Sequence, residues 1–131
     1  MYQIGNLVGK GATASVFSGL NLETGETVAI KQFQIENLCP RDLASIKDEI
    51  DLLKQLKHKN IVSYYGFIEA EGCLNVIMEY CENGSLQNVV KRFGQGLTLD
   101  VVSNYVYQIL EGLVYLHSQG VIHGDIKCWN F

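Results

Sequence analysis

Four polar side chains stand close together in VIHGDIKCWNF, the stretch from residue 121 to residue 131. They are His123, Asp125, Lys127 and Asn130, and side chains of these types at such close, fixed spacing are typical of a catalytic loop. The simpler alternative for Asp125 is that its carboxylate only caps a turn. Because Lys127 and Asn130 lie beside it, we favour the catalytic interpretation.

A second segment that could do chemistry is GKGATASV, in which Gly9, Gly11 and Ala14 follow a G-x-G-x-x-A pattern. A Walker A loop is excluded, because only three residues separate Gly5 from Gly9 and because Gly11 follows Lys10. A Rossmann fingerprint would have to open a helix, whereas the SVFSGL that follows is typical of a strand. Two interpretations stay open: a hairpin whose glycines let the backbone approach phosphates, and an ordinary glycine-rich hairpin.

The third candidate is Lys31 in the apolar segment VAIK. The alternation of a strand puts Val28 and Ile30 on one face and Ala29 and Lys31 on the other. A lysine in such a strand either faces solvent at an edge or needs a partner, since burying an unpaired charge is costly. Glu49 projects from the edge of an apolar helical stripe and is a plausible partner. This ion pair would hold Lys31 extended toward a phosphate.

The segments that must position these residues form five strands with one helix inserted, followed by further helices. Strands are predicted over 2–9, 15–21, 27–33, 60–69 and 73–80 from their β-branched and aromatic content. Pro40 opens the inserted helix, where its missing N–H costs nothing. A long helix runs from about Leu99 to Gln119, with Gly120 as its C-terminal cap. This helix is apolar on most of its circumference, so it should need covering on several sides.

Composition limits the possible functions. The 131 residues are 47% hydrophobic and 18% charged, which predicts one folded domain. A net charge of −4 argues against a general nucleic-acid binder. The four cysteines form no CxxC pair, so neither a zinc site nor a disulfide framework is suggested, and reduced thiols in the cytoplasm fit best. No signal core and no membrane span are expected.

In this order along the chain, GKGATASV, VAIK, Glu49 and HGDIKCWN resemble the signature set of the protein kinases. The resemblance spans the whole chain but covers about the first half of a kinase domain. Within the family, EIDLLKQLKHKNIVSYYG, MEYCENGSL and ILEGLVYLHSQGVIH are most similar to mitogen-activated protein kinase kinase kinases, of the epsilon type and the fungal septation-initiation type. The resemblance implies an α+β protein-kinase-like fold. It would comprise a five-stranded N-lobe with one helix over about 1–80, then the hinge and the first C-lobe helices over 81–131.

The resemblance also implies ATP and Mg²⁺ as cofactors, a protein substrate, which would include a downstream kinase, and an activating protein partner. Lys31 would hold the α- and β-phosphates with Glu49 fixing it, and Met78 would be the gatekeeper. The backbone of Glu79 and Cys81 would bind adenine. The nucleotide-binding positions would together be Gly9, Gly11, Val16, Ala29, Lys31, Glu49, Met78, Glu79, Cys81 and Ser85, the last reaching the ribose.

In the catalytic loop, the resemblance makes Asp125 the acceptor of the proton from the attacking hydroxyl. Lys127 would neutralise the transferring phosphate and Asn130 would hold a magnesium ion. Lys127 favours a serine/threonine kinase over a tyrosine kinase. Three residues depart from the family pattern. Ala14 replaces the third glycine of the glycine-rich loop, which is tolerated in many kinases. Gly124 replaces the arginine that pairs with a phosphorylated activation loop, and Trp129 stands where small residues are usual.

The 131 residues contain no Asp-Phe-Gly segment and no activation loop after the catalytic loop. As a consequence, metal binding would fall to Asn130 alone. We expect this chain by itself to be inactive, and the simplest cause is a truncated gene product or an incomplete gene model. The alternative function is a non-catalytic, pseudokinase-like module that binds nucleotide or a protein partner. Intact Lys31, Glu49 and Asp125 favour the kinase interpretation for the family.

Overall fold

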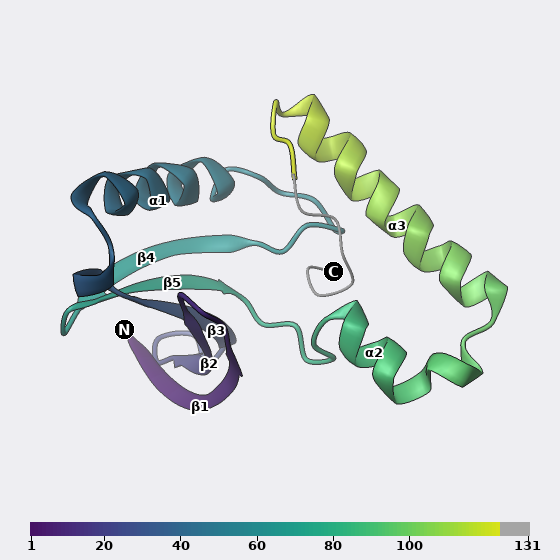
Figure 1. The fold of residues 1–131 in the computed structure, drawn as a ribbon, viewed down its shortest axis with the longest axis horizontal. Coiled ribbons are helices and arrows are strands. Elements are labelled where there is room, and N and C mark those ends of the chain that lie inside the picture. The colour runs from purple at the N-terminus through teal and green to yellow at the C-terminus, as the bar shows by residue number, and fades with distance from the viewer. Residues whose placement is uncertain (124–131) are drawn as a thin grey trace. The chain divides into compact units, whose positions relative to one another are not determined.

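A computed structural model of the chain describes residues 1–123 (Figure 1). It confirms the predicted α+β class and the order of five strands with one inserted helix. The elements are β1 (Tyr2–Lys10), β2 (Ser15–Asn21), β3 (Thr27–Gln34), the 3₁₀ turn η1 (Ile35–Asn37), α1 (Pro40–Leu53), β4 (Tyr64–Ala70), β5 (Cys73–Glu79), α2 (Leu86–Phe93), the 3₁₀ turn η2 (Gly94–Gly96) and α3 (Leu99–Ser118).

The chain divides into two compact units. The first unit comprises residues 1–57 and 62–80, and the second comprises residues 58–61 and those after Tyr80. Among residues 1–123, no helix is long and apolar enough to cross a membrane.

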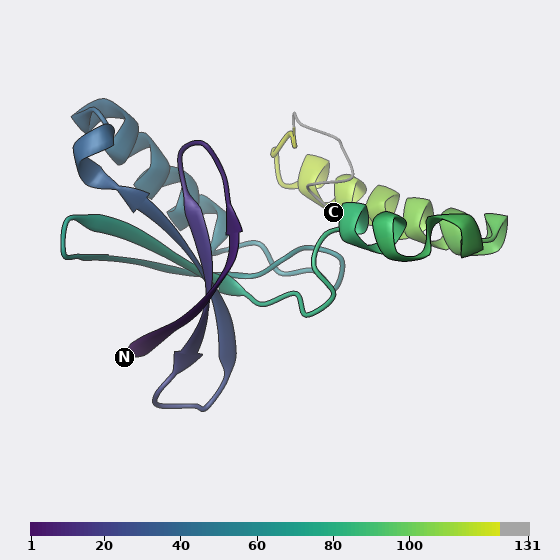
Figure 2. The same cartoon turned by 60° about the horizontal axis from the view of Figure 1, so that its bottom comes forward.

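The first unit is a five-stranded antiparallel sheet in the order β1-β2-β3-β5-β4, whose twist is visible in Figure 2. β4 and β5 are joined through Glu71 and Gly72, which have φ angles of 52° and 74°. Two central residues with positive φ characterise the tight turns whose twist matches that of a hairpin, and glycine adopts them without strain. β4 comes last in the strand order and is therefore an edge strand. This short turn joins it to β5.

Both faces of the sheet are covered near its centre. Val28 and Ile30 are each 1% exposed and pack with Ile77, and Tyr2 lies against this cluster. The predicted alternation of VAIK is thus confirmed for Val28 and Ile30. Ala29, on the other face, is also buried at 8% exposure, so β3 is a central strand and not the solvent-facing edge strand that was one alternative for Lys31.

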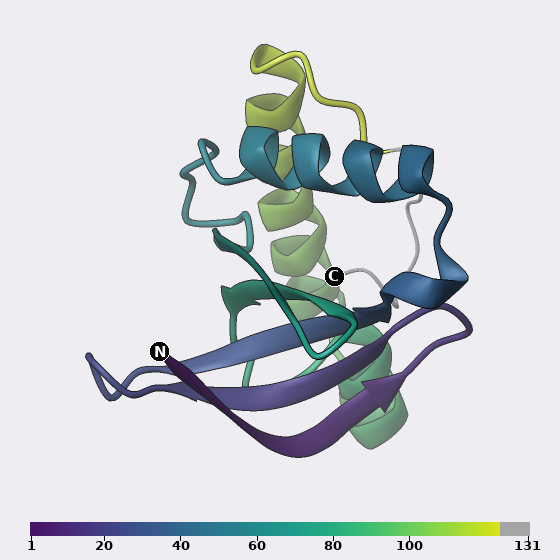
Figure 3. The same cartoon turned by 90° about the vertical axis from the view of Figure 1, so that its left-hand side faces the viewer.

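α1 begins as the sequence predicts, with Pro40 in its first turn after the N-cap residue Cys39, whose sulfur accepts from the Asp42 N–H at 3.4 Å. The helix lies along one side of the sheet, next to β4 (Figure 3). Its apolar stripe contributes Ile50, which is 3% exposed. α1 is therefore held to the sheet by burial of one face rather than by its ends.

The strand predicted from Asn60 begins instead at Tyr64. Residues 58–61 belong to the second unit, where the Asn60 amide donates to the Gln108 carbonyl at 3.1 Å and to Glu111 Oε2 at 3.0 Å. The Asn60 side chain is therefore bound to α3, and residues 58–61 are not part of the strand. The composition of residues 58–61 does not reveal these hydrogen bonds, because the partners of Asn60 lie about fifty positions further along the chain.

In the second unit, Thr98 caps α3 by accepting from the Val101 N–H at 3.3 Å, and Gly120 follows the helix with a φ of 75°. Both ends agree with the prediction to within a residue. Large apolar side chains of α3 remain solvent-exposed in the described part of the chain, as its apolar circumference predicted: Leu99, Val101, Val102, Val106, Tyr107, Leu110 and Val114.

Candidate functional site

Five of the residues predicted to bind nucleotide share one face of the sheet. In the strand registers, Gly9 lies opposite Val16, and Val16 lies opposite Lys31. Ala29, two residues before Lys31, lies opposite Met78. Directly opposed residues in a sheet project to the same face, as do residues two apart in one strand. Strand pairing therefore assembles side chains and backbone from four strands into one candidate site.

The glycine-rich segment forms the predicted hairpin between β1 and β2. The Gly11 N–H donates to the Ala14 carbonyl at 2.8 Å and closes its tip. A Cβ atom on Gly9 would meet no heavy atom within 4 Å, and one on Gly11 would meet only the Ala14 oxygen, at 3.5 Å. The space beside both glycines is thus open, and a bulky anion such as a triphosphate could approach the backbone there.

The ion pair predicted between Lys31 and Glu49 is wrong for this structure: no such contact forms among residues 1–123. The ammonium of Lys31, a half-buried residue, lies 5.4 Å from the centroid of the Phe33 ring instead. Glu49 is exposed. Burial raises the pKa of the Tyr64 phenol, and the negative charge of Glu49 raises it further, so Glu49 lies near enough to Tyr64 to act on it.

A different ion pair joins α1 to the sheet, between Lys47 Nζ and Glu69 Oε1 of β4. The same ammonium lies 5.8 Å from the centroid of the Phe67 ring. Sequence reasoning missed this pair. A helical wheel places Lys47 beside the apolar stripe as clearly as Glu49, but only the β4 register shows which acid it meets.

The residues predicted to bind adenine and ribose lie at the end of β5 and just after it. The Glu79 N–H donates to the Ser63 carbonyl at 2.8 Å, and its carboxylate accepts from the Ser63 N–H at 3.0 Å. Ser85, in the second unit, is the N-cap residue of α2, but its side chain makes no capping hydrogen bond. Its hydroxyl is buried and has no hydrogen-bond partner among the described residues, which is uncommon for a buried hydroxyl and fits a group that a ligand satisfies. Cys81 is exposed.

The predicted catalytic and metal-binding residues Asp125, Lys127 and Asn130 lie outside the described residues, as do Gly124 and Trp129. Their assignment continues to rest on the sequence pattern.

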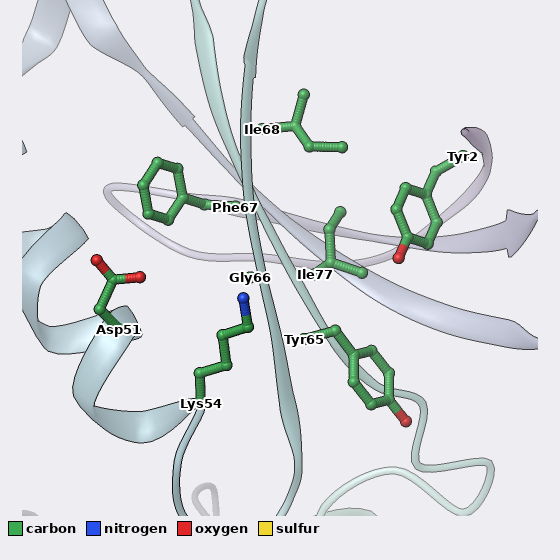
Figure 4. Close-up of a pocket in the computed structure, with 8 residues that line it drawn as sticks. All are labelled: Tyr2, Asp51, Lys54, Tyr65, Gly66, Phe67, Ile68 and Ile77. Atoms are coloured by element: carbon green, nitrogen blue, oxygen red, sulfur yellow. The ribbon is translucent and has the colours of Figure 1, made fainter.

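A pocket of about 290 Å³ lies elsewhere, at the outer edge of β4 and the end of α1 (Figure 4). Lys54 extends toward Gly66 there, with its Nζ 3.9 Å from the position that a Cβ on Gly66 would occupy. The lining residues are Tyr2, Asp51, Lys54, Tyr65, Gly66, Phe67, Ile68 and Ile77. No residue predicted to bind nucleotide is among them, so this pocket is separate from the candidate site.

Comparison with known proteins gives a consistent result. The family model described as "Protein kinase domain" matches residues 2–131. The chain is 53% identical over 126 residues to Cytokinesis protein sepH of Aspergillus niger, covering 96% of the chain and 9% of that protein. It is 53% identical over 128 residues to MAP3K epsilon protein kinase 1 of Brassica napus, covering 96% and 10%. Cell division control protein 7 of Schizosaccharomyces pombe is 50% identical over 124 residues, covering 95% and 12%.

The chain thus spans about a tenth of the length of these curated relatives. The resemblance to the epsilon and septation types, predicted from the sequence, is confirmed by the matches. Because the family model covers residues 2–131, nearly the whole chain, the chain belongs to the protein kinase family.

Proposed function

We propose that this chain contributes the ATP-binding half of a serine/threonine protein kinase of the mitogen-activated protein kinase kinase kinase type. The observation that carries the proposal is the common sheet face of Gly9, Val16, Ala29, Lys31 and Met78. Protein kinases use ATP with Mg²⁺, and the bound nucleotide supplies the phosphoryl group that is transferred.

On this face the residues have distinct tasks. The Gly9–Gly11 hairpin backbone would approach the phosphates, since a Cβ on Gly9 would meet nothing within 4 Å and one on Gly11 would meet only the Ala14 oxygen, at 3.5 Å. Lys31 would hold two phosphates by its charge. The buried Ala29 and the neighbouring Val16 and Met78 would form an apolar surface for adenine.

Hydrogen bonds to adenine and ribose would come from the last residue of β5 and the segment that follows it. Because the Glu79 N–H already donates to Ser63, only the Glu79 carbonyl would serve adenine, as an acceptor. The Cys81 backbone would supply a donor. The unpartnered Ser85 hydroxyl would bind the ribose and so gain the hydrogen bond that it lacks within the described residues.

The chemical step would fall to the loop near the end of this chain. Asp125 would accept the proton of the attacking hydroxyl, Lys127 would stabilise charge on the transferred phosphoryl group, and Asn130 would bind Mg²⁺. The acceptor would be a serine or threonine of a protein, and the name MAP3K epsilon protein kinase of one relative supports a downstream kinase as that protein. An activating protein partner and a cytoplasmic location are part of the same proposal. Cys39 and Cys73 are free thiols, which suits a reducing compartment.

The test is titration of a fluorescent ATP analogue against the wild type and Lys31→Met. We expect at least tenfold weaker binding, about 1.4 kcal/mol, because a hydrogen bond to a charged group contributes about 1.5–3 kcal/mol. Lys54→Met is the matched control, since Lys54 is a lysine of the same unit that lies at the separate pocket. Equal affinity of wild type and Lys31→Met would refute the assignment of the nucleotide site.

A further inference from the structure

The pocket beside β4 is built on an irregularity of that strand. The pairing of β4 with β5 shifts between residues 64 and 66, so that Tyr65 has no opposite residue on β5. A bulge of this kind re-aims a side chain. Gly66 follows with a φ of 140°, and a Cβ on it would have only Lys54 Nζ within 4 Å, at 3.9 Å. The bulge thus presents Tyr65 at the edge of the sheet and leaves the space beside Gly66 open.

Two tyrosines and Ile77 line one side of this pocket (Figure 4). Ile77 is 3% exposed, and Tyr2 packs against the cluster to which Ile77 belongs. Tyr65 is 38% exposed, so its ring is accessible to a ligand. The face of a tyrosine ring attracts a cation, and the planar guanidinium of arginine also stacks on it. The side chains of the pocket therefore suit a cationic group.

The charges that act on Tyr65 are negative. Desolvation raises the pKa of the Tyr65 phenol, and the charges of Glu26, Glu79 and Tyr2 raise it further. Glu79 ends β5 two residues after Ile77, so its side chain projects to the same face of the sheet. Its Oε2 accepts from the Ser63 N–H at 3.0 Å, and a carboxylate has a second oxygen that can accept from a ligand. Both glutamates thus lie near the Tyr65 phenol.

The remaining charges of the pocket oppose each other. Asp51 and Lys54 both line it and carry opposite charges. Lys54 is not among the groups that shift the pKa of Tyr65, so its ammonium does not offset the two glutamates there. Glu26 and Glu79 therefore decide the sign of the pocket, and the complementary ligand is a cation. Arginine fits better than lysine, because its guanidinium stacks on an aromatic ring and donates to carboxylates at the same time.

We propose that this pocket binds an arginine side chain of a basic protein segment. The guanidinium stacks on the Tyr65 ring and donates to the carboxylates of Glu26 and Glu79. The site is separate from the nucleotide site proposed above, because only the backbone of Glu79 was assigned to adenine. The test is therefore independent of the proposed function.

The probe is the peptide acetyl-Gly-Arg-Gly-amide, titrated into the ¹⁵N-labelled chain. Its binding is followed by the nuclear magnetic resonance shift of the Gly66 amide, which lies in the pocket. We expect a saturable shift with the arginine peptide and weaker binding of the same peptide with lysine in place of arginine. The peptide with glutamate in that place should not bind.

Four variants assign the contacts. Tyr65→Leu should weaken binding about twofold to fivefold, as for the loss of an exposed cation–π contact, whereas Tyr65→Phe keeps the ring and should bind like wild type. Glu26→Gln should weaken binding about twofold, because exposed charge pairs are weak. Lys54→Met should tighten binding, since it removes a positive charge from the pocket. Glu71→Gln is the matched control for Glu26→Gln, because Glu71 is an exposed acid six residues after Tyr65, about 20 Å along an extended strand.

Each outcome decides the proposal. A Gly66 amide that does not shift with the arginine peptide would overturn it, and so would equal affinities of Tyr65→Leu and Tyr65→Phe. Weaker binding by Lys54→Met, or binding of the glutamate peptide in preference to the arginine peptide, would show that the pocket takes an anion instead. Tyr65 is partly exposed, so Tyr65→Leu should fold, and unchanged amide shifts outside the pocket would verify this.

Discussion

Ile30 packs directly over Gly19, and this contact predicts strong coupling between the two positions. A Cβ atom on Gly19 would lie 2.5 Å from Ile30 Cδ1, 3.0 Å from its Cγ1 and 3.2 Å from Val28 Cγ2. Real Cβ atoms do not come so close, so Gly19→Ala must displace Ile30 in a tightly packed cluster. Overpacking of this kind costs about 1–3 kcal/mol.

The partner substitution is Ile30→Ala. It removes three carbon atoms from a side chain that is 1% exposed. At about 0.8 kcal/mol per carbon the lost transfer free energy is about 2.4 kcal/mol, and the residual cavity raises the cost to about 3–4 kcal/mol. The same change removes Ile30 Cδ1 and Cγ1, the two atoms that would lie closest to a Cβ on Gly19. The double variant should therefore be about as stable as Ile30→Ala alone, which is a coupling free energy of about 1–3 kcal/mol.

Urea unfolding followed by far-ultraviolet circular dichroism measures all four free energies of unfolding in this cycle. Ile68→Ala is the control for loss of apolar volume, because Ile68 is 42% exposed on the edge strand and should cost less than about 1 kcal/mol. If the two single effects add to within about 0.3 kcal/mol, Ile30 does not pack on Gly19 and the account of this core is refuted.

Two further predictions concern the second unit. Desolvation raises the pKa of Glu111, but the Asn60 hydrogen bond and the charge of Lys59 outweigh it and lower the pKa below its usual 4.5. Glu111 therefore stabilises the fold at neutral pH, and this contribution is lost as the pH falls through the lowered pKa. Melting temperatures of wild type and Glu111→Gln should converge in acid, and a constant difference would contradict the assignment. Gly112→Val should lower the melting temperature more than Gly96→Val, because a Cβ on Gly112 would lie 3.2 Å from the Asn60 carbonyl oxygen, whereas one on Gly96 meets nothing within 4 Å.

Much of the fold follows from local sequence signals. Pro40, Thr98 and Gly120 mark helix boundaries because proline, threonine and glycine each suit one backbone position at a helix end. The alternation in VAIK correctly assigns Val28 and Ile30 to one face, since side chains of a strand alternate regardless of what they meet. The start of β4 is the exception. Asn60 has strand-like neighbours in sequence, but its hydrogen bonds to Gln108 and Glu111 lie far along the chain.

The sequence by itself determined the kinase motifs, their order and the position of Glu49 at the edge of the apolar stripe of α1, because motif spacing and helical periodicity are local properties. Only the tertiary structure decided which partners these residues meet. Strand register placed Gly9, Val16, Ala29, Lys31 and Met78 on one face. The rotation of α1 gave Lys47 its partner Glu69 and left Glu49 beside Tyr64. That rotation depends on the balance of burial and charge along the whole length of the helix, which no single residue pair reveals.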